Sequence, residues 1–189
     1  MIDVIDDLFD ERYLHNFFPI VTDKIPLTAG NTANREGFPY GDTSTHRLFG
    51  SQIFQRENLN RTTVLSPYAQ DFFDMFEAIQ TKMEKDFYLY YISLNCQHQF
   101  CEGSFHTDGD SDQRTIMVML NPTWKQDWGG EFEIQDPFAE GTRIYQYKPG
   151  RVIVFPSHLK HRGHAPKQEY GYRLSLIHIS EPTRRLCLA

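Results

Sequence analysis

The sequence predicts an α+β domain, in which a strand sandwich or barrel is backed by helices on one side. Three observations lead to this fold class. The length of 189 residues suits a single domain. Two stretches before residue 86 carry apolar side chains at helical spacing. After Lys85 the pattern changes to short alternating segments separated by turn residues, which is typical of strands.

Two helices are expected in the first part of the chain. The first begins at one of the aspartates within residues 6–10, which can cap a helix, and ends before Pro19. The second begins at Ser66-Pro67, where a capping residue precedes a proline at the first helical position, and extends to about Lys85. Residues 21–62 lack a clear period and should form loops with one or two short strands. The inner face of the second helix is apolar: Phe72, Phe73, Phe76, Ile79 and Met83.

Strands follow in the second half, each rich in aromatic or β-branched residues: 87–94, 115–120, 131–134, 143–147, 151–155 and 172–177. Turn-forming pairs separate them: Asn121-Pro122, Gly129-Gly130, Asp136-Pro137 and Pro149-Gly150. The chain is therefore divided into a helical and loop support region (1–85), a β-rich core (86–177) and a C-terminal tail (178–189). The polar tail resembles a translated foreign sequence, so we expect no function from it.

Composition indicates which classes of binding partner and which cellular compartment to expect. Twenty-five acidic residues against nineteen basic ones give a net charge of -6, which argues against nucleic acid or an anionic membrane as the main partner. The three cysteines (Cys96, Cys101 and Cys187) cannot all pair, so a reducing compartment is expected. No apolar run approaches the roughly 20 residues that span a bilayer, and the N-terminal residues lack the order of a signal peptide. We therefore expect a soluble, cytoplasmic protein.

The motif His106-Thr107-Asp108 is the first candidate metal site. In an extended segment, residues i and i+2 point the same way, so His106 and Asp108 can present a nitrogen and an oxygen to one point. Two histidines and one carboxylate form the facial triad of non-haem Fe(II) oxygenases, which leaves positions open for O2 and a co-substrate. A histidine and an aspartate alone are weak evidence, because most such pairs are surface turns.

The second half of the chain adds the missing parts. Three histidines, His158, His161 and His164, follow the predicted strand 151–155. Beyond them, Arg173 lies in an otherwise strand-like segment. An arginine that points into a barrel needs an anionic partner, because the burial of an unpaired guanidinium is prohibitively costly. Its planar fork matches a carboxylate, so Arg173 indicates a bound acid.

Together these features resemble the Fe(II)/2-oxoglutarate-dependent dioxygenases, in the prolyl 4-hydroxylase-like branch. The resemblance rests on the His106-Thr107-Asp108 motif, on the Gly150–Ser157 segment that precedes His161, and on Arg173 with Ser175. Two further segments resemble motifs that this branch carries between its halves: Leu120-Asn121-Pro122-Thr123-Trp124 and Trp128-Gly129-Gly130-Glu131. The resemblance covers about residues 86–177, whereas residues 1–85 match only in having helices that would back the sheet.

The resemblance implies a double-stranded β-helix, or jelly roll, with the N-terminal helices on one side. It implies Fe(II) bound by His106, Asp108 and a distal histidine, with 2-oxoglutarate on the iron and its far carboxylate on Arg173, where Ser175 is a second donor. In the family reaction O2 is split: one oxygen atom enters succinate as CO2 is lost, and the other hydroxylates an unactivated C–H bond. The expected substrate is a prolyl residue in a peptide or, behind it, an amino acid or small metabolite, and ascorbate is a further candidate cofactor.

Two positions of the implied site stay open. For the distal ligand, the family pattern favours His161; His164 is next because it is closer to Arg173 in sequence, and His158 fits a loop or supporting residue. Many relatives bind 2-oxoglutarate with a tyrosine, but the strand at 116–119 has none. The residues that can replace it are Thr115, Asn95, Tyr88 and Tyr90, and we assign Thr115 to the cofactor-binding set.

Two other functions fit parts of the pattern. A jelly-roll module that binds without catalysis would keep the shell, but the complete ligand set argues against it, since a degenerate copy would be expected to lose one ligand or the arginine. A cupin-like metalloenzyme that does not use 2-oxoglutarate would leave Arg173 without a role. In an iron titration with 2-oxoglutarate, the absence of both a visible charge-transfer band and succinate would favour the binding module. Activity that does not depend on 2-oxoglutarate would favour the cupin-like enzyme.

Overall fold

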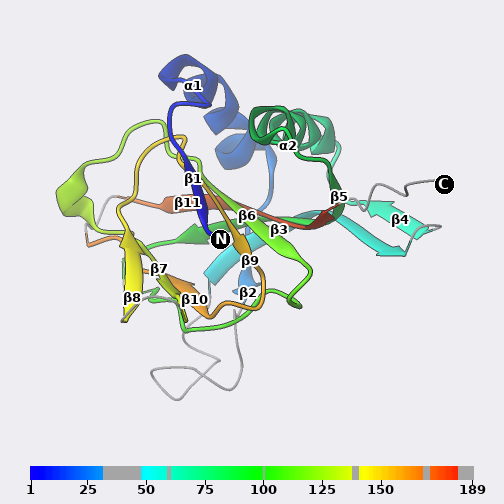
Figure 1. Cartoon of the computed structure of the whole chain (residues 1–189). Coiled ribbons are helices and arrows are strands. Elements are labelled where there is room, and N and C mark those ends of the chain that lie inside the picture. The colour runs from blue at the N-terminus through cyan, green and yellow to red at the C-terminus, as the bar shows by residue number, and fades with distance from the viewer. Residues whose placement is uncertain (32–47, 59–60, 100, 138–140, 168–170, 183–189) are drawn as a thin grey trace.

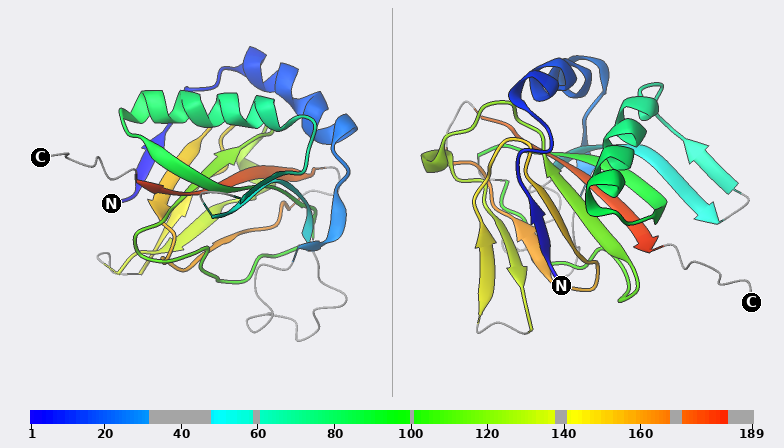
Figure 2. Two further views of the ribbon diagram at one scale, coloured as in Figure 1. Left: turned by 90° about the vertical axis from the view of Figure 1, so that its right-hand side faces the viewer. Right: turned by 45° about the horizontal axis from the view of Figure 1, so that its top comes forward.

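The computed structural model describes residues 1–31, 48–58, 61–99, 101–137, 141–167 and 171–182. In these ranges, two antiparallel sheets pack against each other and two helices cover the outer side of the larger sheet (Figures 1 and 2). The larger sheet runs in the order β1 (Asp3–Ile5), β9 (Val152–Pro156), β6 (Arg114–Met119), β11 (Arg173–Pro182), β5 (Phe87–Gln97), β3 (Leu48–Asn58) and β2 (Thr28–Asn31), with β4 (Arg61–Val64) paired to β3. The smaller sheet runs β10 (His161–Gly163), β7 (Phe132–Gln135) and β8 (Thr142–Tyr145). This arrangement confirms the predicted fold class.

The strands at the centre of the larger sheet are buried on both faces. In β6, Ile116 and Val118 face the helices, whereas Met117 and Met119 face the smaller sheet. The same alternation holds in β9. Because successive side chains of a strand point to opposite faces, one short apolar run supplies both cores. The apolar core between the sheets is completed from the smaller sheet by Phe132 and Ile134.

The helices lie where the sequence predicts them, with shifted ends. Helix α1 (Glu11–Pro19) begins at Asp10, whose side chain accepts a 2.7 Å hydrogen bond from the Tyr13 amide, and a π-helical turn (Ile20–Lys24) follows it. Helix α2 (Ala69–Met83) begins three residues after Ser66, whose hydroxyl accepts instead from the Tyr68 amide. Both helices pack on the larger sheet through one apolar face. No helix in the described ranges is long and apolar enough to cross a membrane.

The last strand is longer than the sequence predicts. Strand β11 was expected to end at Ile177, but it continues to Pro182 and pairs with β5 along its whole length and with β6 as far as Ser180. The alternation that begins with Leu174 and Leu176 extends through His178 and Ser180, which are also buried. Because ladder hydrogen bonds are made by the backbone, polar residues can continue a strand that periodicity would end. Residues 183–189, including Cys187, lie outside the described residues, and the foreign origin of the tail stays a prediction.

The N-terminal region supplies strands as well as helices. Strand β1 pairs with β9, and β2 to β4 extend the other edge of the larger sheet. Near β1, Asp6 accepts two hydrogen bonds from Arg151, at 2.8 Å and 2.9 Å, so a bidentate ion pair joins the N-terminus to the start of β9. The larger sheet therefore spans the expected boundary between residues 85 and 86.

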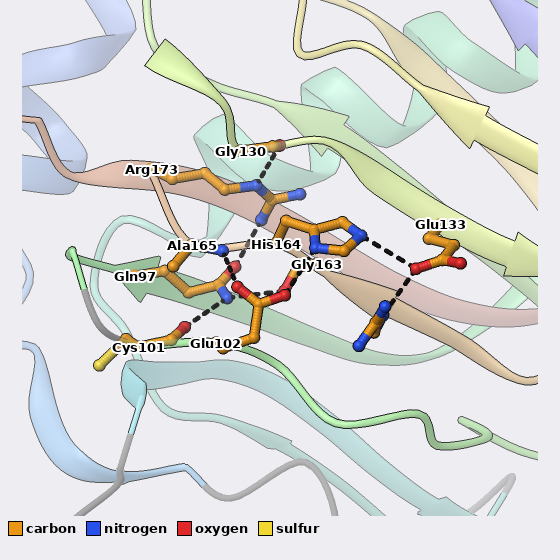
Figure 3. A network of polar contacts seen from close by, with 10 residues as sticks. Gln97, Cys101, Glu102, Gly130, Glu133, Gly163, His164, Ala165 and Arg173 are labelled. Atoms are coloured by element: carbon orange, nitrogen blue, oxygen red, sulfur yellow. Dashed lines mark hydrogen bonds and ion pairs between the residues drawn. The ribbon is translucent and has the colours of Figure 1, made fainter. Parts of the chain in front are cut away.

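A charged cluster joins the smaller sheet to the segment before His106. His164 lies between two carboxylates, with Nδ1 2.6 Å from Glu102 Oε1 and Nε2 2.9 Å from Glu133 Oε2 (Figure 3). Arg162 donates to the same oxygen of Glu133 at 2.7 Å, and Glu102 also accepts from the Ala165 amide. The hydrogen bond to Glu102 raises the pKa of His164. Burial alone would raise the pKa values of Glu102 and Glu133, but their hydrogen bonds to His164 and Arg162 outweigh burial and lower them.

This cluster should give stability that depends on pH. The raised pKa of His164 provides stability that is complete below the unfolded value of 6.5 and declines as the pH rises through the folded pKa. The lowered pKa values of the glutamates provide stability that is complete above 4.5 and declines as the pH falls. We therefore expect His164→Gln to lower the free energy of unfolding by about 1–3 kcal/mol, with the largest loss between pH 4.5 and 6.5.

Urea unfolding at a series of pH values measures this difference. The matched control is His15→Gln, which changes an exposed histidine on α1. A difference between His164→Gln and the unchanged chain that stays constant from acid to alkaline pH would contradict the assigned role.

Candidate active site

A cavity of about 240 Å³ lies between the two sheets. Its walls come from β5, β6 and β11 of the larger sheet, from β7 and β10 of the smaller sheet, and from residues 103–108. Six candidate residues from the sequence line it: Asn95, His106, Asp108, His161, Arg173 and Ser175. The fold therefore gathers residues from distant parts of the chain, since Ser175 and His106 are 69 positions apart.

Backbone pairing brings the two histidines together. The His106 amide donates to the His161 carbonyl at 3.0 Å, and the His161 amide donates to the His106 carbonyl at 2.9 Å. This antiparallel bridge places the ring centroids 4.4 Å apart. Asp108 follows two residues after His106 and reaches both rings: its oxygens lie 3.4 Å from His106 Nε2 and 3.3 Å from His161 Nε2. One donor atom from each of the three side chains lies within 4.8 Å of the others, which is the spacing that one metal ion needs.

Hydrogen bonds on the far side of each ring orient the two histidines. Nδ1 of His106 lies 2.9 Å from the Ser104 carbonyl, and Nδ1 of His161 lies 2.9 Å from the Leu159 carbonyl. Because a carbonyl oxygen only accepts, each Nδ1 must carry the hydrogen. In the neutral imidazole the lone pair is then on Nε2, which faces Asp108. Histidines that bind metals are commonly held in this way.

Asp108 is held as a carboxylate. Its Oδ2 accepts from Thr115 Oγ1 at 3.0 Å, and its amide donates to the Ser157 carbonyl at 3.0 Å. Burial alone would raise the pKa of Asp108, but when the two imidazoles are protonated their hydrogen bonds and charges outweigh burial and hold it far below its usual range. Burial alone would lower the pKa of His106, whereas Asp108 raises it above its usual value. The three side chains thus place an anionic carboxylate between two imidazole nitrogens.

Arg173 provides the positive end of the cavity. Its side chain is only 2% exposed, and its partners are all neutral: Nε donates to the Gly130 carbonyl at 2.8 Å, and Nη1 donates to Gln97 and Ser175. Nη2 is buried without a hydrogen-bond partner among the described residues. A buried guanidinium that keeps one nitrogen unpaired beside a cavity fits an acidic ligand.

Asn121 holds the start of β11 on both sides of Arg173. Its Oδ1 accepts from the Leu174 amide at 2.8 Å, and its Nδ2 donates to the Tyr172 carbonyl at 2.7 Å. The ring of Tyr147 lies under the guanidinium, 5.5 Å from its carbon, and its hydroxyl contacts Asn121. The Leu-Asn motif therefore has a structural role, because it fixes the strand that carries the arginine.

The other candidates from the sequence, except Asn95, do not line the cavity. His164 is held by Glu102 and Glu133, and His158 is exposed, so of the three clustered histidines His161 is the one beside Asp108. Thr115 is not among the residues that line the cavity: its hydroxyl contacts Asp108 and Ser157 instead. Tyr88 and Tyr90 pack on each other and also lie outside the lining, whereas Asn95 is part of it.

Apart from Asn95, sequence reasoning missed the polar face of β5. Tyr91, Ser93, Asn95 and Gln97 all line the cavity. They occur at every second position, so they share one face of the strand. A polar alternation of this length within a strand of aromatic and aliphatic residues is a signal that could have identified this wall.

A comparison with protein families gives a match over residues 88–179 to the model described as the 2OG-Fe(II) oxygenase superfamily. A search of curated proteins gave no significant match. Among solved structures, an oxidoreductase of the 2OG-Fe(II) oxygenase family from Burkholderia pseudomallei is similar, with a TM-score of 0.73, 14% identity, and coverage of 95% of this chain and 84% of that one.

Two prolyl hydroxylases have a similar fold. One is the Trichoplax adhaerens prolyl hydroxylase in complex with a peptide fragment of the hypoxia inducible factor oxygen degradation domain, with a TM-score of 0.67, 13% identity, and coverage of 95% and 83% of the two chains. The other is a Pseudomonas putida prolyl-4-hydroxylase, with a TM-score of 0.60, 13% identity, and coverage of 97% and 93%. The family match, the jelly roll and a His-Asp-His group that fits a metal ion lead to one conclusion. Residues 88–179 match the 2OG-Fe(II) oxygenase superfamily, and the protein is accordingly a dioxygenase whose cofactors are Fe(II) and 2-oxoglutarate.

Proposed function

We propose that the enzyme is a hydroxylase in which His106, Asp108 and His161 hold Fe(II) and Arg173 binds the far carboxylate of 2-oxoglutarate. One observation carries the proposal. Three ligand atoms within 4.8 Å of one another share a cavity with a buried arginine that keeps one nitrogen unpaired. Metal ligation and acid recognition are the two requirements of this chemistry, and both are met in one place.

The protein residues bind, orient and exclude water. When bound, Fe(II) supplies the activation of O2 that no side chain can provide. The carbonyls of Ser104 and Leu159 fix the ligand face of each imidazole, and the low pKa of Asp108 keeps its carboxylate ionised. Three protein ligands leave further positions open for 2-oxoglutarate and O2. The apolar side chains of Met117 and Phe132 exclude water from the cavity wall.

The co-substrate's far carboxylate would bind Arg173 through Nη2, with the Ser175 hydroxyl as a second donor. Ser175 Oγ lies 3.1 Å from Arg173 Nη1 and lines the cavity. A charge-assisted hydrogen bond in a buried site is strong, so this contact would select a dicarboxylic oxo acid.

Thr115 has a different role in the proposed site from the one expected. Its hydroxyl is fully buried between Asp108 Oδ2 and Ser157 Oγ, at 3.0 Å and 2.9 Å. This position supports orientation of the Asp108 carboxylate rather than a direct contact with 2-oxoglutarate.

The proposed substrate is a prolyl residue in a peptide, with free amino acids as the second choice. The fold shared with two prolyl hydroxylases, one of them solved with a peptide, supports this choice. An ascorbate requirement and a cytoplasmic location stay predictions from the sequence.

Removal of a metal ligand should abolish turnover. His106→Ala, Asp108→Ala and His161→Ala are each expected to abolish 2-oxoglutarate-dependent succinate release, because the ion loses one of three ligands. Arg173→Ala should mainly raise the KM for 2-oxoglutarate. His158→Ala, which alters an exposed histidine of the same cluster, is the control. Normal succinate release by Asp108→Ala would refute this ligand assignment.

Loss of the Thr115 hydroxyl should weaken metal binding while the fold is kept. Thr115→Val has nearly the same shape, so we expect a dissociation constant for Mn²⁺ that is about 10–100-fold higher, as for other residues that orient a ligand. Thr115→Ser keeps the hydroxyl and should bind Mn²⁺ nearly as well as the unchanged chain. Calorimetric titration measures both, and equal affinities of the valine and serine variants would argue against this role.

A substrate screen tests the proposed reaction. Proline-containing peptides should stimulate succinate release above the uncoupled rate, and the peptide should gain one oxygen atom by mass spectrometry. Matched peptides with alanine in place of proline are the control. If free amino acids stimulate turnover and peptides do not, the substrate assignment is wrong although the hydroxylase assignment holds.

A further inference from the structure

We propose that Gln97 is a positioning residue for the co-substrate: it holds Arg173 through a neutral amide oxygen and so leaves the charge of the guanidinium available to a ligand carboxylate. This inference rests on the proposed function. Gln97 is the last residue of β5 and lies opposite Arg173 in the β11–β5 register. Its side chain is only 3% exposed.

Three hydrogen bonds fix the orientation of the Gln97 amide (Figure 3). Nε2 donates to the Cys101 carbonyl at 2.9 Å and to the Gly163 carbonyl at 3.0 Å. Oε1 accepts from Arg173 Nη1 at 2.9 Å. Because two carbonyl oxygens surround the nitrogen and a guanidinium faces the oxygen, the reverse orientation of the amide would create three clashes of like groups.

The glutamine joins three parts of the active site. Gly163 lies two residues after His161, and Cys101 lies on the segment that leads to His106. Arg173 is the third part. One side chain therefore sets the position of the acid-binding group relative to the two histidines.

Two glycines, Gly130 and Gly163, pack so closely against Arg173 that a larger residue would not fit at either position. A Cβ atom at Gly163 would lie 2.8 Å from Gln97 Oε1 and 3.1 Å from Arg173 Nη1. A Cβ atom at Gly130 would lie 3.2 Å from Arg173 Cδ. Arg173 is thus confined on several sides, and the side chain at position 97 supplies a hydrogen-bond partner of its Nη1 atom.

The neutrality of Gln97 carries the functional consequence. A glutamate has nearly the same shape; it would lose the hydrogen bonds to the Cys101 and Gly163 carbonyls and would form a buried ion pair with Arg173. The charge of the guanidinium would then be compensated within the protein, and a ligand carboxylate would gain less on binding and would face a nearby negative charge. Since Gly130, Gln97 and Ser175 are all neutral partners, the charge of Arg173 is instead compensated by the ligand.

The test compares two ligands on the complete chain loaded with Mn²⁺ under anaerobic conditions. 2-Oxoglutarate carries the far carboxylate, whereas 2-oxopentanoate has the same carbon chain with a methyl group in its place. In Gln97→Glu, calorimetry should show a dissociation constant for 2-oxoglutarate that is at least about tenfold higher. The dissociation constant for 2-oxopentanoate should stay the same or fall.

Gln99→Glu is the matched control. It introduces the same charge two residues further on, at a side chain that contacts the Lys167 carbonyl and not Arg173. Its two dissociation constants should equal those of the unchanged chain. An equal loss of 2-oxoglutarate binding in Gln99→Glu would overturn the inference, because the effect would then belong to net charge alone.

Other outcomes are equally decisive. Equal weakening of both ligands in Gln97→Glu would show that Gln97 only supports the fold, and an unchanged affinity for 2-oxoglutarate would show that it does not act on Arg173. If circular dichroism shows that Gln97→Glu is unfolded, Gln97→Met is the variant to measure. Its dissociation constant for 2-oxoglutarate should be at least about threefold higher, and that for 2-oxopentanoate should be unchanged. Equal losses of affinity for the two ligands would overturn the inference. If the unchanged chain with Mn²⁺ does not bind 2-oxoglutarate, the proposed function itself fails, which is a separate result.

Discussion

The backbone bridge between His106 and His161 is the interaction on which the site depends. The two residues exchange both amide hydrogen bonds, so the segments that carry the two rings are held at a fixed distance from each other. The bridge also places Asp108 beside both rings. The convergence of three ligand atoms is thus a consequence of strand pairing, and the side chains add only the hydrogen bonds that orient each ring.

The fold places a negative and a positive side chain at separate places in the cavity wall. Asp108 supplies the negative charge at one end, where two imidazoles and Thr115 surround it. Arg173 supplies the positive charge, and its partners are neutral. Because Asp108 and Arg173 are not paired with each other in the described part of the chain, a cation can bind at one end and a carboxylate at the other. Outside the cavity the pattern is reversed: Glu102, His164, Glu133 and Arg162 satisfy one another.

The larger sheet links these features to the stability of the whole chain. Its central strands are buried on both faces, with the helices on one side and the cavity and smaller sheet on the other. Strand β5 shows the division clearly: Ile92, Leu94 and Cys96 pack beneath the helices, and the residues between them line the cavity.

The sequence by itself determined the helices, the positions of six strands and the placement of His106 and Asp108 on one face, because periodicity and turn residues act locally. The jelly roll came from the resemblance to a family. The family match confirms the Fe(II) and 2-oxoglutarate chemistry that the motifs predicted. Only the tertiary structure decided which histidine lies beside Asp108, that Thr115 contacts Asp108, that β11 continues to Pro182, and that Gln97 holds Arg173. The physical reason is that alternation along a strand tells which side chains share a face, whereas the register between strands decides which of them meet.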